Sequence, residues 1–165
     1  MICIKFTDWN WSIILTILNI IVTIIVPYYI YSKWNNQKKY EVISNSASII
    51  LKEILILRED AIYIYTYYKK DDVEKNRENL KLIAEKSDFI ESELKAIGNE
   101  IDKFKNNNNR IEIDYFHTAY KSYIQKTNKL RESIGRDFES ATITNLGEAT
   151  NNLSVYLSKL KFYSI

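Results

Sequence analysis

The sequence predicts an all-α protein with one membrane-spanning helix near the N-terminus, followed by a bundle of four long helices. Three observations lead to this prediction. The 165 residues include only 3 Gly and 1 Pro, too few for the turns of a many-stranded sheet. Residues 11–31 contain no charged side chain. Beyond that run, apolar residues recur at alternating spacings of three and four, which is the period of a helix with one buried face.

The uncharged run has the length of a transmembrane helix. At about 1.5 Å per residue it extends roughly 31 Å, close to the ~30 Å hydrocarbon core of a bilayer. Aromatic residues bracket the run, as they do at membrane interfaces; they are Trp9, Trp11, Tyr28, Tyr29, Tyr31 and Trp34. A cleaved signal peptide is the competing interpretation, but the run is long and ends at Pro27 and several tyrosines, without a small-residue cleavage site. We therefore expect an anchor over residues 1–34 and a helical domain over residues 35–165.

The lysines around the run predict its orientation. Lys33, Lys38 and Lys39 follow it, whereas Lys5 alone precedes it and is balanced by Asp8. Positive charge is enriched on the cytoplasmic side of single-span proteins. The domain after the anchor is therefore expected in the cytoplasm.

Four polar residues interrupt the apolar run at helical spacing. Ser12, Thr16, Asn19 and Thr23 are separated by four, three and four residues, so they share one face of a helix. An amide near the bilayer centre is costly unless it faces protein or water. The stripe is thus either a helix–helix interface joined by polar side chains or the lining of a narrow pore. Both interpretations require self-association, because the chain supplies a single spanning helix.

The remaining sequence predicts helices over residues 37–70, 73–105, 110–138 and 146–163, which short connections would pack as antiparallel neighbours. The inward positions are Tyr40, Ile43, Ala47, Ile50, Ile54, Leu57, Ala61, Ile64 and Tyr68 in the first helix; Leu80, Ile83, Ile90, Leu94, Ile97, Ile101 and Phe104 in the second; Phe116, Tyr120, Tyr123, Thr127, Leu130 and Ile134 in the third; and Leu153, Tyr156, Leu160 and Tyr163 in the fourth. The same stripes are also compatible with coiled-coil seams between subunits.

Several local signals refine these helices. Asp72 is expected to cap the second helix. The four asparagines at residues 106–109 predict a loop, and residues 140–147 predict another, with Asn145 and Glu148 as a capping box. The first helix carries further apolar residues outside its stripe, which predicts burial by more than one neighbour; these are Ile49, Leu51, Leu55, Ile56, Ile62 and Tyr63.

Composition argues against several function classes. Lys and Arg number 23 and Asp and Glu 21, a net charge of +2, so direct nucleic-acid binding is not expected. Cys3 is the only cysteine, and neither an internal disulfide nor a zinc site can be built from it. The glycines at 98, 135 and 147 form no phosphate loop. We therefore expect no cofactor and no metal.

One pair of residues is a candidate for chemistry. His117, the single histidine, follows Arg110 by seven residues, or two helical turns, and Asp114 lies between them. An Arg beside a His can stabilise a phosphoryl oxyanion while the His exchanges protons, as a metal-free ribonuclease requires. The alternative is that both are surface residues at a helix start, or part of a subunit contact.

The Arg110–His117 spacing resembles the R-x4-6-H motif of the HEPN superfamily of small helical bundles, although Ile111 replaces the polar residue often found after the Arg. With one anchor and a helical bundle, the chain resembles the small membrane accessory proteins of type VI-B, RNA-targeting CRISPR systems. That resemblance implies an oligomeric pore in the bacterial inner membrane that depolarises it and strengthens antiphage defence, with an RNA-guided effector complex as a possible partner. It implies no need for catalysis, so that Arg110 and His117 would serve a subunit interface or a control point. A membrane-tethered HEPN ribonuclease and a non-catalytic membrane scaffold are the alternatives.

Overall fold

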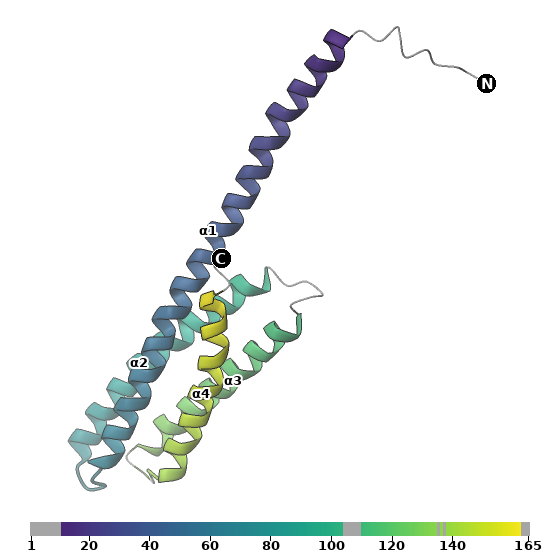
Figure 1. Ribbon diagram of the computed structural model, residues 1–165. Coiled ribbons are helices and arrows are strands. Elements are labelled where there is room, and N and C mark those ends of the chain that lie inside the picture. The colour runs from purple at the N-terminus through teal and green to yellow at the C-terminus, as the bar shows by residue number, and fades with distance from the viewer. Residues whose placement is uncertain (1–10, 104–109, 135, 137, 163–165) are drawn as a thin grey trace. The chain divides into compact units, whose positions relative to one another are not determined.

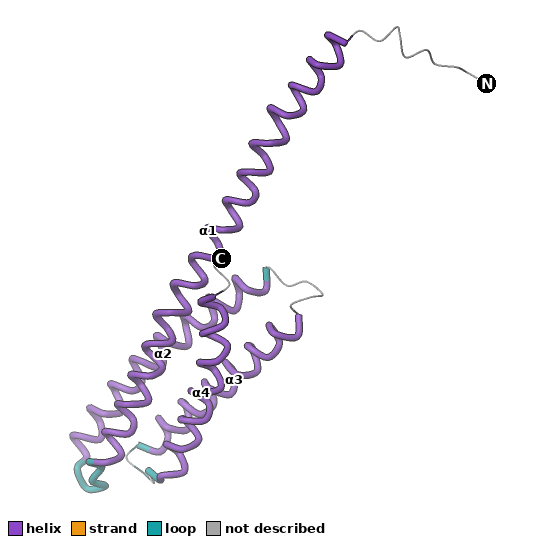
Figure 2. The backbone as a smooth tube through the Cα atoms, in the orientation of Figure 1, coloured by secondary structure: helices purple, strands orange, loops and turns teal. Residues whose placement is uncertain are grey.

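The computed structural model describes residues 11–103, 110–134, 136 and 138–162 of the chain. These residues form four helices and no strand: α1 (Trp11–Thr66), α2 (Val73–Asp102), α3 (Arg110–Ser133) and α4 (Ser140–Phe162), as Figures 1 and 2 show. The predicted all-α class is confirmed. The predicted asparagine loop, Phe104 and Tyr163 lie outside the described residues.

The chain divides into two compact units, Met1–Lys39 and Tyr40–Ile165, which are described separately here. Helix α1 contributes to both, because the predicted segment 11–31 and most of the predicted segment 37–70 fall within one helix. Pro27 lies inside α1. The helix ends at Thr66 instead of residue 70, where the amide of Tyr68 bonds to the carbonyl of Tyr65 at 3.2 Å in a tighter turn.

In the N-terminal unit, the described residues form a single helix without a buried side chain. Its apolar residues are exposed all around the helix, for example Leu15 at 63% and Ile24 at 65%. By length and composition, α1 is the one described helix long and apolar enough to cross a membrane. An isolated helix with this much exposed aliphatic surface requires an apolar environment or partner helices.

In the C-terminal unit, one hydrophobic core is built from all four helices. Its buried apolar side chains are Ile43, Ala47, Ile50, Ile54, Leu57, Ala61 and Ile64 from α1; Ile83, Ile90, Leu94, Ile97 and Ile101 from α2; Ile113, Phe116, Ala119, Tyr123 and Leu130 from α3; Leu146, Ala149, Leu153 and Leu157 from α4; and Ile134 and Phe138 between α3 and α4. Leu80, Tyr120, Tyr156 and Leu160 are partly buried against this core, and Thr127 is buried within it. The predicted stripes are therefore largely confirmed, whereas Tyr40 is exposed.

The prediction that further neighbours cover α1 is wrong for most of its extra apolar residues. Ile49 and Tyr63 are 56% and 61% exposed, and Leu55 and Ile62 are also exposed. Of the six residues, Leu51 alone packs against the core as a partly buried side chain. The physical reason is that the bundle part of α1 buries one stripe, and the apolar residues beside that stripe remain at the surface.

The turn between α1 and α2 is fixed by two side chains. The Asp72 carboxylate accepts a hydrogen bond from the Lys75 amide at 3.1 Å, which confirms the predicted N-cap of α2. Asn76 is buried in the first turn of α2, and its Nδ2 donates to the carbonyls of Lys69 at 3.0 Å and Lys70 at 3.4 Å. These bonds satisfy carbonyls that no longer belong to a helix.

The predicted boundary between the third and fourth helices is wrong. Helix α3 ends at Ser133 and α4 begins at Ser140, so the predicted loop over residues 140–147 is helical. Phe138 does not extend α3 because its ring packs edge-on against Tyr65 and Tyr68, with centroids 5.4 Å apart in both pairs. Asn145 lies inside α4, so it cannot form a capping box with Glu148.

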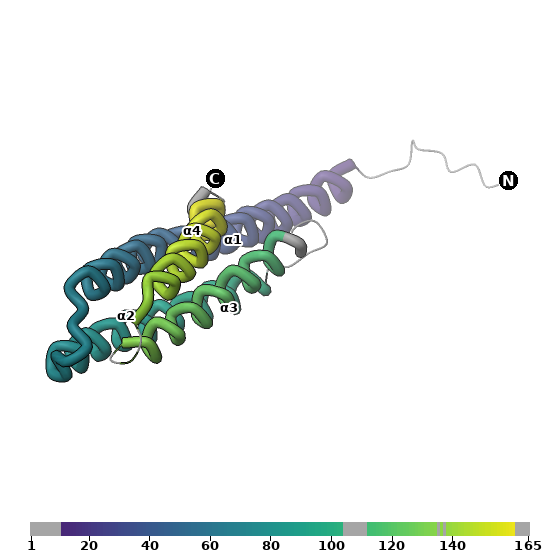
Figure 3. The backbone as a smooth tube through the Cα atoms, turned by 90° about the horizontal axis from the view of Figure 1, so that it is seen from below, coloured from purple at the N-terminus to yellow at the C-terminus, as the bar shows by residue number. Residues whose placement is uncertain are grey.

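Helices α3 and α4 lie side by side and run in opposite directions, and α2 lies along α3 (Figures 1 and 3). This is the antiparallel packing expected of consecutive helices joined by short connections. Two side-chain contacts join the bundle part of α1 to other helices of the C-terminal unit. The Asp60 carboxylate pairs with Lys86 of α2, and Arg58 donates to Asn151 of α4 at 3.4 Å.

Candidate functional site

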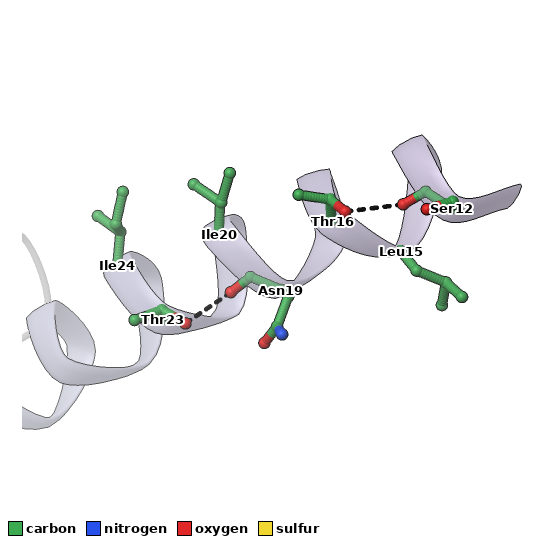
Figure 4. Close-up of a pocket in the computed structure, with 7 residues that line it drawn as sticks. All are labelled: Ser12, Leu15, Thr16, Asn19, Ile20, Thr23 and Ile24. Carbon is green, nitrogen blue, oxygen red and sulfur yellow. Dashed lines mark hydrogen bonds between the residues drawn. The ribbon is translucent and has the colours of Figure 1, made fainter. Parts of the chain in front are cut away.

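The polar stripe of α1 lies along one side of the N-terminal unit. Ser12, Thr16, Asn19 and Thr23 occupy the floor of an open depression that follows the helix (Figure 4). The depression is lined by Ser12, Leu15, Thr16, Asn19, Ile20, Thr23 and Ile24. Leu15 flanks the polar side chains on one side, and Ile20 and Ile24 flank them on the other. A narrow polar strip between aliphatic walls suits contact with another helix.

The two threonine hydroxyls in the stripe are satisfied within the helix. Thr16 Oγ1 donates to the carbonyl of Ser12 at 2.8 Å, and Thr23 Oγ1 donates to the carbonyl of Asn19 at 2.7 Å (Figure 4). A threonine can make such a bond four residues back along a helix without any outside partner. These hydroxyls therefore add little cost to placing the helix in an apolar environment.

Asn19 differs from its neighbours in the stripe. Its side chain projects from the helix, and its carboxamide makes no hydrogen bond to any described residue. The group carries two N–H donors and one carbonyl acceptor. Asn19 lies about 12 Å along the helix from Trp11 and about 18 Å from Tyr31, near the middle of the uncharged run. The unmet hydrogen-bonding need of the stripe is thus concentrated in one residue.

Of the candidate pair Arg110 and His117, the described side chains include His117 only. Arg110 begins α3, but its side chain lies outside the described residues, and Ile111 likewise. The structure therefore does not test whether the two side chains meet. Asp114 is exposed on the same helix.

His117 contacts α2 through the side of its ring that carries Cε1 and the two nitrogens. Its Nε2 lies 3.1 Å from Asp102 Oδ1 at the end of α2. Beside it on the ring, a Cβ added to Gly98 would lie 3.1 Å from His117 Cε1, so glycine is what allows the ring to approach α2 this closely. The Phe116 ring stands edge-on to the imidazole at 5.6 Å between centroids. The imidazole, 26% exposed, connects α3 to α2.

Sequence reasoning missed Asp102 and Gly98 as partners of His117. The available signals were a glycine inside an otherwise regular helical pattern and a carboxylate near the end of the same helix. Neither signal identifies the histidine as its partner, because the contact joins two separate helices.

Other ionisable groups offer no further site. Burial raises the pKa of the Tyr123 hydroxyl well above its usual range, and burial together with the negative charge of Glu91 raises the pKa of Tyr120. Both tyrosines therefore stay neutral at physiological pH. In the described part of the chain, no group of three or more His, Cys, Asp or Glu could hold a metal ion.

Comparison with protein-family models, with curated proteins and with solved structures finds no match to this chain.

Proposed function

We propose that this chain is a single-pass membrane protein whose copies associate through the polar stripe of α1 and form an oligomeric pore. The observation that carries the proposal is the carboxamide of Asn19, which has no partner among the described residues of its own chain. The uncharged run of α1 is the candidate membrane span, and the lysines that follow it support a cytoplasmic position of the bundle.

The cost of an unpaired amide explains why copies would associate. In hydrocarbon, a carboxamide without hydrogen bonds costs several kcal/mol. When equivalent helices meet along the stripe, the Asn19 amide of one copy can donate to the Asn19 carbonyl of the next, and the ring of amides satisfies itself. Measured hydrogen bonds between membrane helices contribute roughly 0.6–2 kcal/mol each. Several copies multiply this contribution around a shared axis.

The chemistry of the stripe favours a water-lined axis over a sealed one. The Thr16 and Thr23 hydroxyls donate to their own helix, but each oxygen retains a lone pair that can accept from water. Asn19 offers both donors and acceptors at the same face. Polar, uncharged groups at one-turn intervals can replace part of an ion's hydration along a narrow pore. A sealed helix interface would use the same residues, and it differs from a pore in that it would release no dye from liposomes.

The biological setting follows from the resemblance to the CRISPR accessory proteins. In that setting the pore sits in a bacterial inner membrane, depolarises it and enhances antiphage defence when an RNA-guided effector complex signals. The exposed apolar surface of the bundle is compatible with a protein partner or with other subunits. The proposal gives His117 no catalytic role; its contacts with Asp102 and Gly98 support a structural role between α2 and α3.

The decisive variant is Asn19→Leu. We expect it to remain in the membrane, because leucine is more apolar, but to lose the oligomer and the leak. The matched controls are Thr16→Val and Thr23→Val, which remove hydroxyls already bonded within the helix and should have much smaller effects. The measurements are the mass of the detergent-extracted particle, release of a dye from liposomes, and membrane potential in cells that overproduce the protein.

Each outcome of this experiment bears on a separate part of the proposal. A wild-type particle with the mass of one subunit would refute self-association. An oligomer that releases no dye would refute the pore and leave a sealed interface or scaffold. Degradation of RNA by the purified protein, abolished by His117→Ala, would replace the pore with the ribonuclease alternative.

A further inference from the structure

We propose that a collar of lysines and aromatic rings at the end of the uncharged run binds the headgroups of anionic phospholipids. The collar consists of Tyr29, Lys33, Trp34, Lys38 and Lys39, all in the N-terminal unit. The inference rests on the membrane insertion proposed above, but it does not depend on self-association or on a pore.

The collar contains two matched pairs of a lysine and an aromatic ring. Lys33 Nζ lies 5.4 Å from the centroid of the Tyr29 ring, and Lys38 Nζ lies 5.8 Å from the centroid of the Trp34 ring. In both pairs the lysine follows the ring by four residues. Tyr29 and Trp34 are 59% and 53% exposed, so the pairs lie on the surface of the helix. The repeated geometry holds two ammonium groups against aromatic faces.

The geometry of these pairs determines how deep the Lys33 and Lys38 ammonium groups lie in the bilayer. Side chains on a helix lean toward its N-terminus, so each lysine leans back toward the apolar run. Lys33 begins about 3 Å and Lys38 about 10 Å beyond Tyr31 along the helix axis. The polar layer of one leaflet is roughly 5–8 Å thick. The two ammonium groups are thereby held at the level of lipid phosphates, and the rings occupy the interface at which Tyr and Trp concentrate.

The sign of the charge selects the kind of lipid. Residues 11–41 contain three lysines and one carboxylate, Glu41, so this stretch carries a net positive charge, and stacking on a ring leaves the charge of an ammonium group in place. A zwitterionic headgroup carries its own cation beside the phosphate, whereas an anionic headgroup does not. Each basic residue near the surface favours anionic lipid by up to about fivefold. We therefore expect the collar to enrich anionic lipid around α1.

Trp34 provides a reporter within the collar. The chain has three tryptophans, so Trp9→Phe and Trp11→Phe together leave Trp34 as the single emitter. The full chain is reconstituted into phosphatidylcholine bilayers that contain a minor fraction of phosphatidylglycerol with brominated acyl chains. A matched sample contains the same fraction of brominated phosphatidylcholine. Because bromine quenches tryptophan only at short range, the ratio of quenching in the two samples measures local enrichment. We expect several-fold stronger quenching by the anionic lipid, and a decrease of the ratio at high salt.

Removing the charges of the collar tests its role. The triple variant Lys33→Gln, Lys38→Gln and Lys39→Gln should bring the quenching ratio close to one. As a matched control, Lys52→Gln, Lys95→Gln and Lys129→Gln remove the same number of charges from exposed positions of the bundle. This control should retain the preference of the parent protein.

The outcomes separate this inference from the proposed function. Equal quenching by both lipids, or a preference that survives the collar variant, would refute headgroup binding while leaving membrane insertion intact. Quenching by neither lipid would refute insertion, and with it both proposals. In the Asn19→Leu background the preference should persist, because the collar acts without association of the stripes; a preference lost there would overturn that independence.

Discussion

The two parts of α1 show how one helix can be built for two different environments. Ile24, in the N-terminal unit, is 65% exposed, and Ile54, in the bundle, is fully buried. In the bundle the apolar residues form a stripe that is buried in the hydrophobic core. In the N-terminal unit the relation is reversed, because polar residues form the stripe and aliphatic residues cover the rest. The arrangement of polar residues, rather than the number of apolar ones, distinguishes the two parts.

The polar side chains of the two units differ in the same way. Asn76, buried in the bundle, donates to two backbone carbonyls of its own chain. Asn19, in the other unit, has no such bond to any described residue. The bundle satisfies most of its buried polar groups internally, with exceptions at Tyr68, Tyr123 and Thr150, whose buried hydroxyl groups find no partner among the described residues. The hydrogen-bonding need of Asn19 is therefore not met within the described part of the chain.

The largest expected difference between the two parts comes from removing one aliphatic side chain from each. Ile54→Ala should lower the free energy of unfolding of the bundle by about 3 kcal/mol, because it leaves a cavity in the core. Ile24→Ala should leave that free energy unchanged. The measurement is a urea titration of the full chain in detergent, followed by near-ultraviolet circular dichroism. Equal losses in both variants would contradict the division into two units.

The second comparison uses the two asparagines. Asn76→Ala should destabilise the bundle by about 1–2 kcal/mol, since the carbonyls of Lys69 and Lys70 each lose one donor, although the Lys69 carbonyl keeps its bond from the Asp72 amide. Asn19→Ala should leave the urea midpoint of the bundle unchanged. It should lower only the mass of the detergent-extracted particle, because the copies no longer associate. An unchanged midpoint for Asn76→Ala would show that water replaces the lost donor without cost.

Tyr123 tests an exception inside the bundle. Tyr123→Phe should raise stability by about 1 kcal/mol at neutral pH, because it removes a buried hydroxyl without a partner. The folded-state pKa of Tyr123 is raised above its ordinary value of 10.0, so the stability present at neutral pH is lost as pH rises above that value. Tyr123 ionises at a lower pH in the unfolded chain than in the folded protein. Above that pH the free energy of unfolding falls by up to about 1.4 kcal/mol per pH unit. Urea titrations near neutral pH and at about pH 11 should therefore show a smaller alkaline loss in the variant.

The smallest effects are expected at two helical glycines of the bundle. Gly147→Ala should stabilise α4 by up to about 1 kcal/mol, because the new Cβ would meet Arg58 Nε at 3.5 Å, an ordinary contact. Gly98→Ala should gain less, since its Cβ would come within 3.1 Å of His117 Cε1 and displace the ring from Asp102. Thermal unfolding of the two variants side by side provides the measurement. A larger gain at Gly98 would show that the ring moves freely.

Local sequence patterns predicted the features that depend on neighbouring residues. The stripe of α1 from Ile43 to Ile64 and the cap at Asp72 follow from spacing and from one side-chain hydrogen bond. The end of α3 could not be predicted in this way, because Phe138 is held by rings from a distant segment. The burial predicted for the apolar residues beside the stripe was wrong for a related reason. Hydrophobicity identifies a side chain that gains from burial, but it does not show whether another part of the chain covers it.

The candidate site likewise has features that local sequence predicts and features that it does not. Spacing alone placed Ser12, Thr16, Asn19 and Thr23 on one face, but it gave no reason to separate Asn19 from the threonines. That distinction required the bonds from the two hydroxyls to their own helix. The association of copies through this stripe stays a prediction, as does any meeting of Arg110 with His117. Contacts between chains leave no periodic trace that separates them from contacts within one chain.

The packing of Phe138 makes the connection between α3 and α4 a spacer of fixed length. Its ring stands edge-on to Tyr65, on the last turn of α1, and to Tyr68 just beyond it. An inserted residue before Phe138 would carry the ring away from both tyrosines. Apart from the buried Ile134 and Phe138, this short segment should therefore tolerate changes of residue type better than changes of length, which is the reverse of the usual behaviour of a surface loop.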